Sequence, residues 1–164
     1  MGLSHEGSVG LAKSFIDAAA KAGADAIKFQ THIAEYESTL DEEFRIKFSQ
    51  EDKTRFDYWR RTSFTKNQWN YLKKYSKKKK ILFISSVFSI FSIELLASIG
   101  QKVFKVGSGE VFSNDIINKL SIKKDYFTIL SSGLSTWKDI DKIAKFFKRK
   151  NSKFALLQCT SNYP

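Results

Sequence analysis

Residues 81–133, ILFISSVFSIFSIELLASIGQKVFKVGSGEVFSNDIINKLSIKKDYFTILSSG, contain the pattern that decides the fold. Three short apolar runs alternate there with two segments of helical periodicity, at 81–85, 90–99, 103–106, 114–120 and 127–131. The apolar runs recur about every 25 residues and show no polar alternation, as strands of a helix-covered parallel sheet do. The stretch therefore predicts an α/β fold.

The same alternation continues on both sides of this stretch. Upstream, Ser8 can cap a helix with Leu11 on its apolar face, and Gly23 can end that helix. Thr65 and Gln68 form the capping-box pattern of another helix. Downstream, a helix from Thr136 to about Lys150 would place its apolar residues, Trp137 among them, on one face. Two further strands are predicted, at 24–29 and 155–159.

One long segment, 31–63, breaks the pattern with polar, charged and aromatic residues. Its length indicates a functional loop that contains some helix. Its basic and aromatic part, 55–61, is interpreted as a substrate-side lid or a subunit contact.

The composition is that of one globular domain. The chain has 164 residues, of which 42% are hydrophobic and 27% are charged. No apolar run approaches the roughly 20 residues that cross a bilayer, and the first ten residues lack the features of a signal peptide. The single cysteine, Cys159, cannot form an internal disulfide. We therefore expect a soluble, cytoplasmic protein without a membrane partner.

The net charge of +11 arises from 28 Lys and Arg against 17 Asp and Glu. Such a charge would suit a basic nucleic-acid-binding protein, which is the weakest of our functional hypotheses. Many of the lysines gather at 73–80 and 138–150, where they fit the ends and outer faces of two predicted helices. Because no nucleic-acid motif accompanies them, a solvated surface explains them better and no nucleic-acid partner is expected.

Polar side chains follow every predicted strand, which favours a closed (β/α)8 barrel over an open doubly wound sheet. They are Lys28 and Gln30, Ser85 and Ser86, Lys105, Ser108 and Glu110, Ser131 and Ser132, and Gln158, Thr160, Ser161 and Tyr163. In a barrel all carboxyl ends of strands meet at one mouth, whereas an open sheet uses only those at its switch point. Five visible strands predict an incomplete barrel.

Two lysines lie inside otherwise apolar strands, Lys28 in AIKFQ and Lys105 in VFKVG. A buried lysine requires a partner. One interpretation is an internal salt bridge between Lys105 and Glu110. The favoured interpretation is a phosphate or carboxylate site, which the two lysines would form with nearby hydroxyl donors and a closely approaching backbone. These donors and backbone groups are Ser86, Ser108, Ser131 and residues 107–109.

The chain resembles the N-acetylneuraminate synthase (sialic acid synthase) family, with its legionaminate and pseudaminate synthase relatives. The resemblance rests on 4–7 SHEG, 23–31 GADAIKFQT, 83–89 FISSVFS, 104–110 FKVGSGE, 129–133 ILSSG and 156–164 LLQCTSNYP. Each motif is short, but together they follow the order and spacing of the family along the whole chain. Ser86-Val87 stands where the family has a hydroxyl residue followed by proline, and Gln158 replaces a frequent histidine.

The resemblance implies a TIM barrel that condenses phosphoenolpyruvate with an open-chain N-acetylated amino sugar of the N-acetylmannosamine type. The product would be a nonulosonate, with phosphate released by C–O cleavage. By position, phosphoenolpyruvate would be held by Lys28, Ser86, Lys105, Ser108, Ser131 and Ser161. Gln30 and Tyr163 would contact the sugar, and Glu110 would move protons beside the reacting carbons, with both lysines assisting the chemistry.

Several parts of the implied enzyme are expected outside this sequence, so 1–164 is interpreted as one partial barrel domain. The resemblance places a first-strand glutamate upstream of Met1, and the histidine ligands of a divalent Mn²⁺ or Mg²⁺ beyond Pro164. It also implies a C-terminal antifreeze-like domain and a homodimer for the full-length protein. The alternative hypothesis is a catalytically silent fragment or an assembly partner of the synthase.

The two histidines, His5 and His32, are predicted to lie near the mouth and to order loops by hydrogen bonding. Neither has a carboxylate partner that the sequence identifies, so they do not define a metal site.

Overall fold

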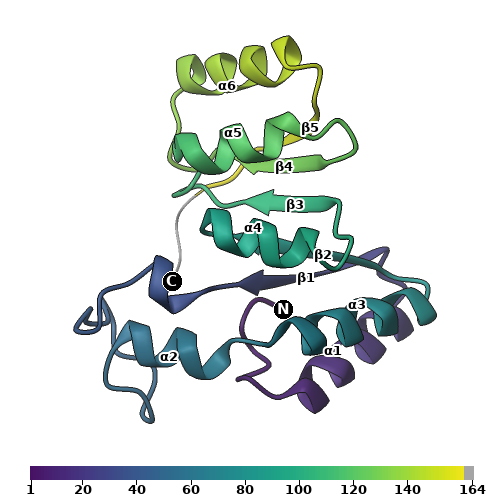
Figure 1. Cartoon of the computed structure of the whole chain (residues 1–164), viewed down its shortest axis with the longest axis vertical. Coiled ribbons are helices and arrows are strands. Elements are labelled where there is room, and N and C mark those ends of the chain that lie inside the picture. Colours follow the sequence, from purple (N-terminus) through teal and green to yellow (C-terminus); the bar gives the residue numbers. More distant parts are fainter. Residues whose placement is uncertain (161–164) are drawn as a thin grey trace.

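Five parallel strands form one sheet in the order β1-β2-β3-β4-β5 (Figure 1). This is a computed structural model, and it describes residues 1–160. The strands are β1 (Ala26–Thr31), β2 (Leu82–Val87), β3 (Val103–Val106), β4 (Phe127–Ser131) and β5 (Lys153–Leu157). The helices are α1 (Val9–Lys21), the 3-10 helix η1 (Ala34–Tyr36), α2 (Arg55–Thr62), α3 (Lys66–Lys78), α4 (Ile90–Ala97), α5 (Asn114–Ile122) and α6 (Trp137–Arg149).

Three helices begin at the polar residues that the sequence predicted. The Ser8 hydroxyl accepts a hydrogen bond from the Leu11 amide at the start of α1. Thr65 and Gln68 form a reciprocal capping box at α3, and Thr136 forms another with Asp139 at α6. These caps satisfy amides that the first turn of a helix leaves free.

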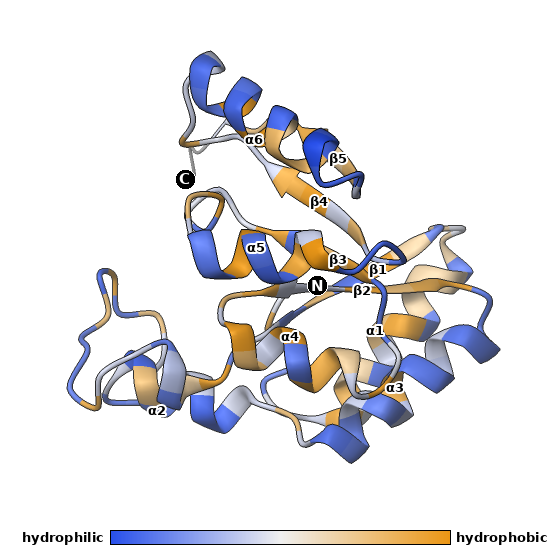
Figure 2. Ribbon diagram, turned by 45° about the horizontal axis from the view of Figure 1, so that its top comes forward, coloured by the Kyte–Doolittle hydropathy of each residue, from blue (hydrophilic) through white to orange (hydrophobic). Residues whose placement is uncertain are grey.

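The sheet has one face covered by helices and one face free of them. Side chains alternate along a strand, and the strand register places Phe29, Phe83, Phe104 and Leu130 on the same face. These four side chains are buried in one hydrophobic cluster with residues of α1 and α3 to α6. Figure 2 shows the matching division in hydropathy: β4 is mostly hydrophobic, whereas α6 alternates hydrophilic and hydrophobic residues.

The strand order and the single helical layer make this sheet part of a (β/α)8 barrel. In a doubly wound sheet the strand order reverses at a switch point and helices cover both faces. Here the order is sequential, and one cluster unites the helices with one face of the strands. Gly2 lies beside Phe29 in a parallel bridge, on the edge of β1 that β2 does not occupy. The prediction of an incomplete barrel is confirmed.

Some boundaries and one helix face differ from the sequence prediction. The last strand is Lys153–Leu157 rather than 155–159, because its register with β4 begins at the pair Phe127 and Lys153. Trp137 is 82% exposed at the first position of α6, where the helix has not yet reached the core. Leu11 is also exposed, since Ala12 and Ile16 occupy the buried face of α1.

The long segment after β1 contains two helices, η1 and α2, as expected for a loop with some helix. We call residues 33–63 the mouth segment, because it follows the carboxyl end of β1. No helix in the part of the chain that the structure describes has the length and hydropathy to cross a bilayer.

Candidate functional site

The helix-free face of the sheet collects the polar strand residues at its carboxyl end. Lys28 of β1, Ser86 of β2 and Lys105 of β3 point to this face, because Gln30 pairs in register with Ser86 and Ser86 with Lys105. The Lys28 ammonium donates a hydrogen bond of 3.3 Å to the Ser86 hydroxyl. The sequence prediction that these three strand residues lie together agrees with this geometry.

The two lysines have no acidic partner within residues 1–160, where neither forms an ion pair with a carboxylate. Burial lowers the pKa of Lys28, and the positive charge of Lys105 lowers it further. The alternative of a salt bridge between Lys105 and Glu110 is not formed, since the Glu110 carboxylate instead accepts from the Ser113 hydroxyl at 3.2 Å. This pair of cations can therefore attract an anion.

Ser131 at the end of β4 and Ser108 in the loop after β3 add hydroxyl groups at the carboxyl end of the sheet. Ser131 ends β4 on the helix-free face, and its hydroxyl is buried without a hydrogen-bond partner in the described chain. The Ser108 hydroxyl accepts a hydrogen bond of 3.1 Å from the Gly133 amide, which joins the loops after β3 and β4. Its own proton stays available for a ligand. A buried hydroxyl without a partner is costly unless a ligand or water satisfies it.

A cavity of about 920 Å³ opens at this mouth, between the strand ends and the mouth segment. Gln30 of β1 and Glu110 of the loop after β3 line it, and the N-terminal residues Met1 to Ser4 line another wall. The other described site residues that the sequence predicted are not part of this lining: Lys28, Ser86, Lys105, Ser108 and Ser131. The mouth segment supplies aromatic and charged walls. These are Tyr36, Glu37, Glu42, Arg45, Phe48, Arg55, Tyr58 and Trp59. The cavity is large enough for a ligand of sugar size.

The mouth segment is fastened to the N-terminal turn by Arg61. Its guanidinium contacts Asp52 at 2.7 Å and Glu6 at 3.0 Å. The hydrogen bonds from Arg61 lower the pKa of Asp52, whose side chain is almost completely buried. Arg61 thus links the mouth segment to the N-terminal turn through Glu6.

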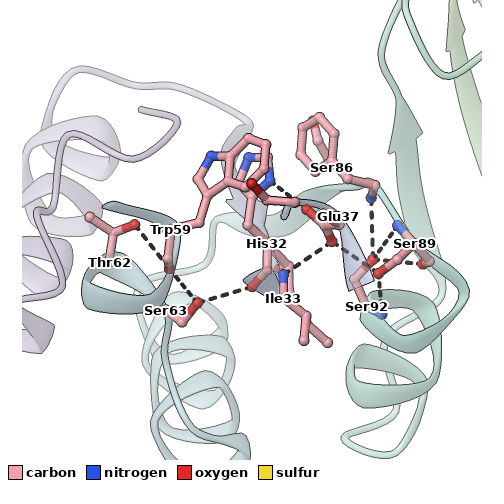
Figure 3. Close-up of polar contacts among 12 residues, drawn as sticks. His32, Ile33, Glu37, Trp59, Thr62, Ser63, Ser86, Ser89 and Ser92 are labelled. Atoms are coloured by element: carbon pink, nitrogen blue, oxygen red, sulfur yellow. Dashed lines mark hydrogen bonds and ion pairs between the residues drawn. The ribbon is translucent and has the colours of Figure 1, made fainter. Parts of the chain in front are cut away.

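His32 and Glu37 fasten the segment at its other end (Figure 3). The His32 Nδ1 atom lies 2.7 Å from the Glu37 carboxylate. Both side chains line the cavity. The prediction that His32 orders a loop by hydrogen bonding agrees with this contact. The sequence did not reveal Glu37 as its partner, although a carboxylate five positions downstream of a histidine was a signal that could have been tested.

His5 also orders a turn, as predicted. Its Nδ1 accepts a hydrogen bond of 3.1 Å from the Gly7 amide, and its ring stacks on Phe64 with centroids 4.4 Å apart. Burial lowers the pKa of His5 to about 4, so the ring is neutral at pH 7. It lies in the core and does not face the cavity.

Two predicted site residues, Ser161 and Tyr163, lie outside the described residues. The divalent cation that the resemblance implies does not fit the described part of the chain. Residues 1–160 contain no group of three His, Cys, Asp or Glu side chains that could hold a metal ion. The cation and its expected ligands therefore stay a prediction, and we assign it no step.

Comparison with known proteins identifies the family. The profile of the NeuB family matches residues 15–164, which is most of the chain. The chain belongs to the NeuB family. The family predicted from the sequence is confirmed, and the matched residues include all of the quoted motifs except 4–7.

Among curated NeuB relatives, the chain is 30% identical to N-acetylneuraminate-9-phosphate synthase of Mus musculus, over all of the chain and 46% of that protein. It is 34% identical to pseudaminic acid synthase of Campylobacter jejuni, over 98% of the chain and 48% of that protein. The chain thus spans about half the length of the curated relatives it matches.

A solved structure has the same fold with comparable identity. The N-acetylneuraminic acid (sialic acid) synthetase of Leptospira borgpetersenii, in complex with citrate, superposes with a TM-score of 0.82 and is 32% identical. The match covers 99% of this chain and 53% of that one.

Proposed function

We propose that the protein condenses phosphoenolpyruvate with an N-acetylated amino sugar of the N-acetylmannosamine type, giving a sialic-acid-like nonulosonate and inorganic phosphate. The observation that carries the proposal is the pair of ammonium groups, Lys28 and Lys105, on either side of Ser86 and without a carboxylate partner in residues 1–160. Phosphoenolpyruvate carries a phosphate and a carboxylate, which two such cations can hold.

The surrounding groups suit this ligand. The free hydroxyl proton of Ser131 and that of Ser108 can each point at an anionic oxygen. With the ligand fixed, its C3 atom attacks the aldehyde carbon of the sugar, and a C–C bond forms. Water adds at C2, and cleavage of the C2–O bond releases phosphate. In this proposal the lysines stabilise the charge that develops, and Glu110, which lines the cavity, moves the protons.

The relatives support the class of product. The named synthases of Mus musculus and Campylobacter jejuni make N-acetylneuraminate-9-phosphate and pseudaminic acid, according to their names. The Leptospira synthetase was solved with citrate, which is also an anion. Gln30, which lines the cavity beside Glu110, is the proposed sugar contact from the sheet, and Tyr163 is proposed as a second one.

Isothermal titration of phosphoenolpyruvate into the 164-residue chain tests the proposal. We expect one binding site, and an affinity at least about tenfold above that for pyruvate or for inorganic phosphate, because each of these lacks one anionic group. Equal affinity for phosphoenolpyruvate, sulfate and phosphate would show a general anion site and would contradict the proposal. An absence of binding would also contradict it.

A catalytically silent assembly partner of the synthase is the second candidate. Incubation with phosphoenolpyruvate and N-acetylmannosamine distinguishes the two. Phosphate release by the 164-residue chain would overturn the silent alternative. Binding of phosphoenolpyruvate without any phosphate release would support it.

A further inference from the structure

The His32 imidazole is held in one orientation by a buried carboxylate (Figure 3). The side chains of His32 and Glu37 are 6% and 3% exposed, and the His32 Nδ1 atom lies 2.7 Å from Glu37 Oε2. Glu37 Oε1 accepts two further hydrogen bonds, from the Ile33 amide at 3.0 Å and from the Ser89 hydroxyl at 2.9 Å. Glu37 therefore links η1 to the start of α4, and these hydrogen bonds hold its carboxylate in one position.

The ring plane is fixed by aromatic neighbours on both faces. The indole of Trp59 stacks on one side with centroids 4.7 Å apart and planes 6° apart. The ring of Phe88 stacks against the imidazole at 3.9 Å and 17°. The Arg55 guanidinium covers the Trp59 ring at 4.4 Å. Four residues from the ends of two strands and from α2 thus form a continuous stack along the cavity wall.

The orientation leaves the second ring nitrogen free toward the cavity. A carboxylate only accepts hydrogen bonds, so Nδ1 carries a proton and donates to Glu37, and in the neutral tautomer that this contact selects Nε2 is an acceptor. No described residue donates to Nε2. Since Nε2 has no partner and is nevertheless not among the fully buried partnerless atoms, it is not fully buried. Since His32 lines the cavity, Nε2 is accessible from it.

The same cavity is lined by Gln30, the proposed sugar contact, and by Glu110, the residue proposed to move protons. A fixed acceptor on an aromatic wall recognises an O–H donor, and the amino sugar is the substrate that carries several hydroxyl groups. We propose that His32 is a sugar-binding residue whose Nε2 accepts a hydrogen bond from one hydroxyl of the acyclic amino sugar, and that Glu37 is the positioning residue that fixes its tautomer. This inference rests on the proposed function and extends it to the specificity for the sugar.

Two variants remove Nε2, and each retains a different feature of the histidine side chain. His32→Phe preserves a flat ring between Trp59 and Phe88 but has no nitrogen. His32→Asn preserves an N–H donor near Glu37 but loses the stack. Tyr71→Phe on the exposed surface of α3 is the matched control, because it lies outside the cavity lining. Thermal unfolding and titration of phosphoenolpyruvate verify that each variant is folded and retains its anion site.

The readout is the affinity for N-acetylmannosamine and its monodeoxy analogues, measured by isothermal titration without phosphoenolpyruvate so that no condensation takes place. In the unsubstituted protein we expect one analogue to bind roughly tenfold more weakly than the parent sugar. In both His32 variants the affinity for the parent sugar should fall by a similar factor. The affinity for that analogue should not fall further, because the hydrogen bond is already absent. Phosphoenolpyruvate affinity and the Tyr71→Phe control should be unchanged.

Three results would overturn the proposal. The first is an affinity difference between the parent sugar and the deoxy analogue that stays the same in the His32 variants, since another group would then bind that hydroxyl. The second is normal sugar affinity in both variants. The third is phosphoenolpyruvate binding without any sugar binding by the unsubstituted chain, which would leave the anion site of the proposed function standing. Failure to bind either ligand would overturn the proposed function and this inference together.

Discussion

Gly7 lies where the N-terminal turn contacts the end of α2. Its φ of +77° is in the left-handed region, and a Cβ atom there would lie 2.5 Å from the Arg61 carbonyl oxygen. Gly23, at the end of α1, has nearly the same φ, +76°, but no atom within 4 Å of its Cβ position. We expect Gly23→Ala to lower the free energy of unfolding by about 1 kcal/mol, the cost of the backbone conformation alone.

The substitution Gly7→Ala should cost about 2 kcal/mol or more, because backbone on both sides must shift in addition. Urea unfolding of the two variants beside the unsubstituted chain measures the difference. Equal losses at the two glycines would show that the turn and α2 do not touch as described.

His5 makes stability depend on pH. Because burial lowers its pKa from 6.5 to about 4, the unfolded chain binds more protons than the folded chain between these values. The free energy of unfolding therefore falls as the pH drops from 6.5 to 4, and the His5 contribution to this loss is complete below pH 4. Above pH 6.5 this residue adds no pH dependence.

The substitution His5→Phe retains an aromatic ring against Phe64 but cannot be protonated. At pH 7 two changes oppose each other, since the Gly7 amide loses its acceptor while the His5 Nε2 atom, buried without a partner in the described chain, is removed. Between pH 7 and 4.5, however, it should lose about 2 to 3 kcal/mol less than the unsubstituted chain. Urea unfolding at both pH values checks this. Equal losses of unfolding free energy in the two proteins between these pH values would show that His5 does not cause the pH dependence.

At the level of elements, the mouth segment depends on the ion pairs of Arg61. Asp52 has a side chain only 5% exposed, and it accepts hydrogen bonds from Arg61 and from Ser49. Arg61→Met would leave this carboxylate buried without its cation. We expect a loss of about 2 kcal/mol, below the value for fully buried pairs because Arg61 is partly exposed.

The neighbouring Arg60 is the control for this prediction, because it reaches Glu35 only at 4.0 Å and is largely exposed. Arg60→Met should change stability by less than about 0.5 kcal/mol. Hydrogen exchange of residues 38–62 is the second readout, and it should accelerate in the Arg61 variant alone. Unchanged exchange in that variant would mean that other contacts hold the segment.

Features that depend on neighbouring residues, such as helix caps, could be predicted from the sequence. Features that depend on contacts with distant segments, such as strand ends, could not. The caps at Ser8, Thr65 and Thr136 depend on atoms within one turn, and all three are present. The final strand was displaced by two residues, because its ends are set by pairing with β4. Trp137 has the helical spacing of a core residue, yet it precedes the part of α6 that reaches the sheet.

At the scale of the whole molecule, the repeating apolar runs and the polar strand ends predicted the barrel and its helix-free face. Their spacing was enough because parallel strands of a barrel follow chain order and share one mouth. The stack that holds His32 escaped prediction, since Trp59 and Phe88 come from segments 27 and 56 residues away in the sequence. Such contacts follow only once the mouth segment is placed against the strands.

Lys28 and Lys105 are proposed to bind one phosphoenolpyruvate molecule together. Titration of this ligand into the double variant Lys28→Met/Lys105→Met measures their joint contribution, and Lys138→Met/Lys142→Met, which removes the same charge from α6, is the control. We expect the strand variant to lose at least about a hundredfold in affinity, as two charge-assisted contacts disappear, and the helix variant to bind normally. Equal losses in the two variants, or undiminished binding in the strand variant, would show that the two strand lysines do not form the binding site.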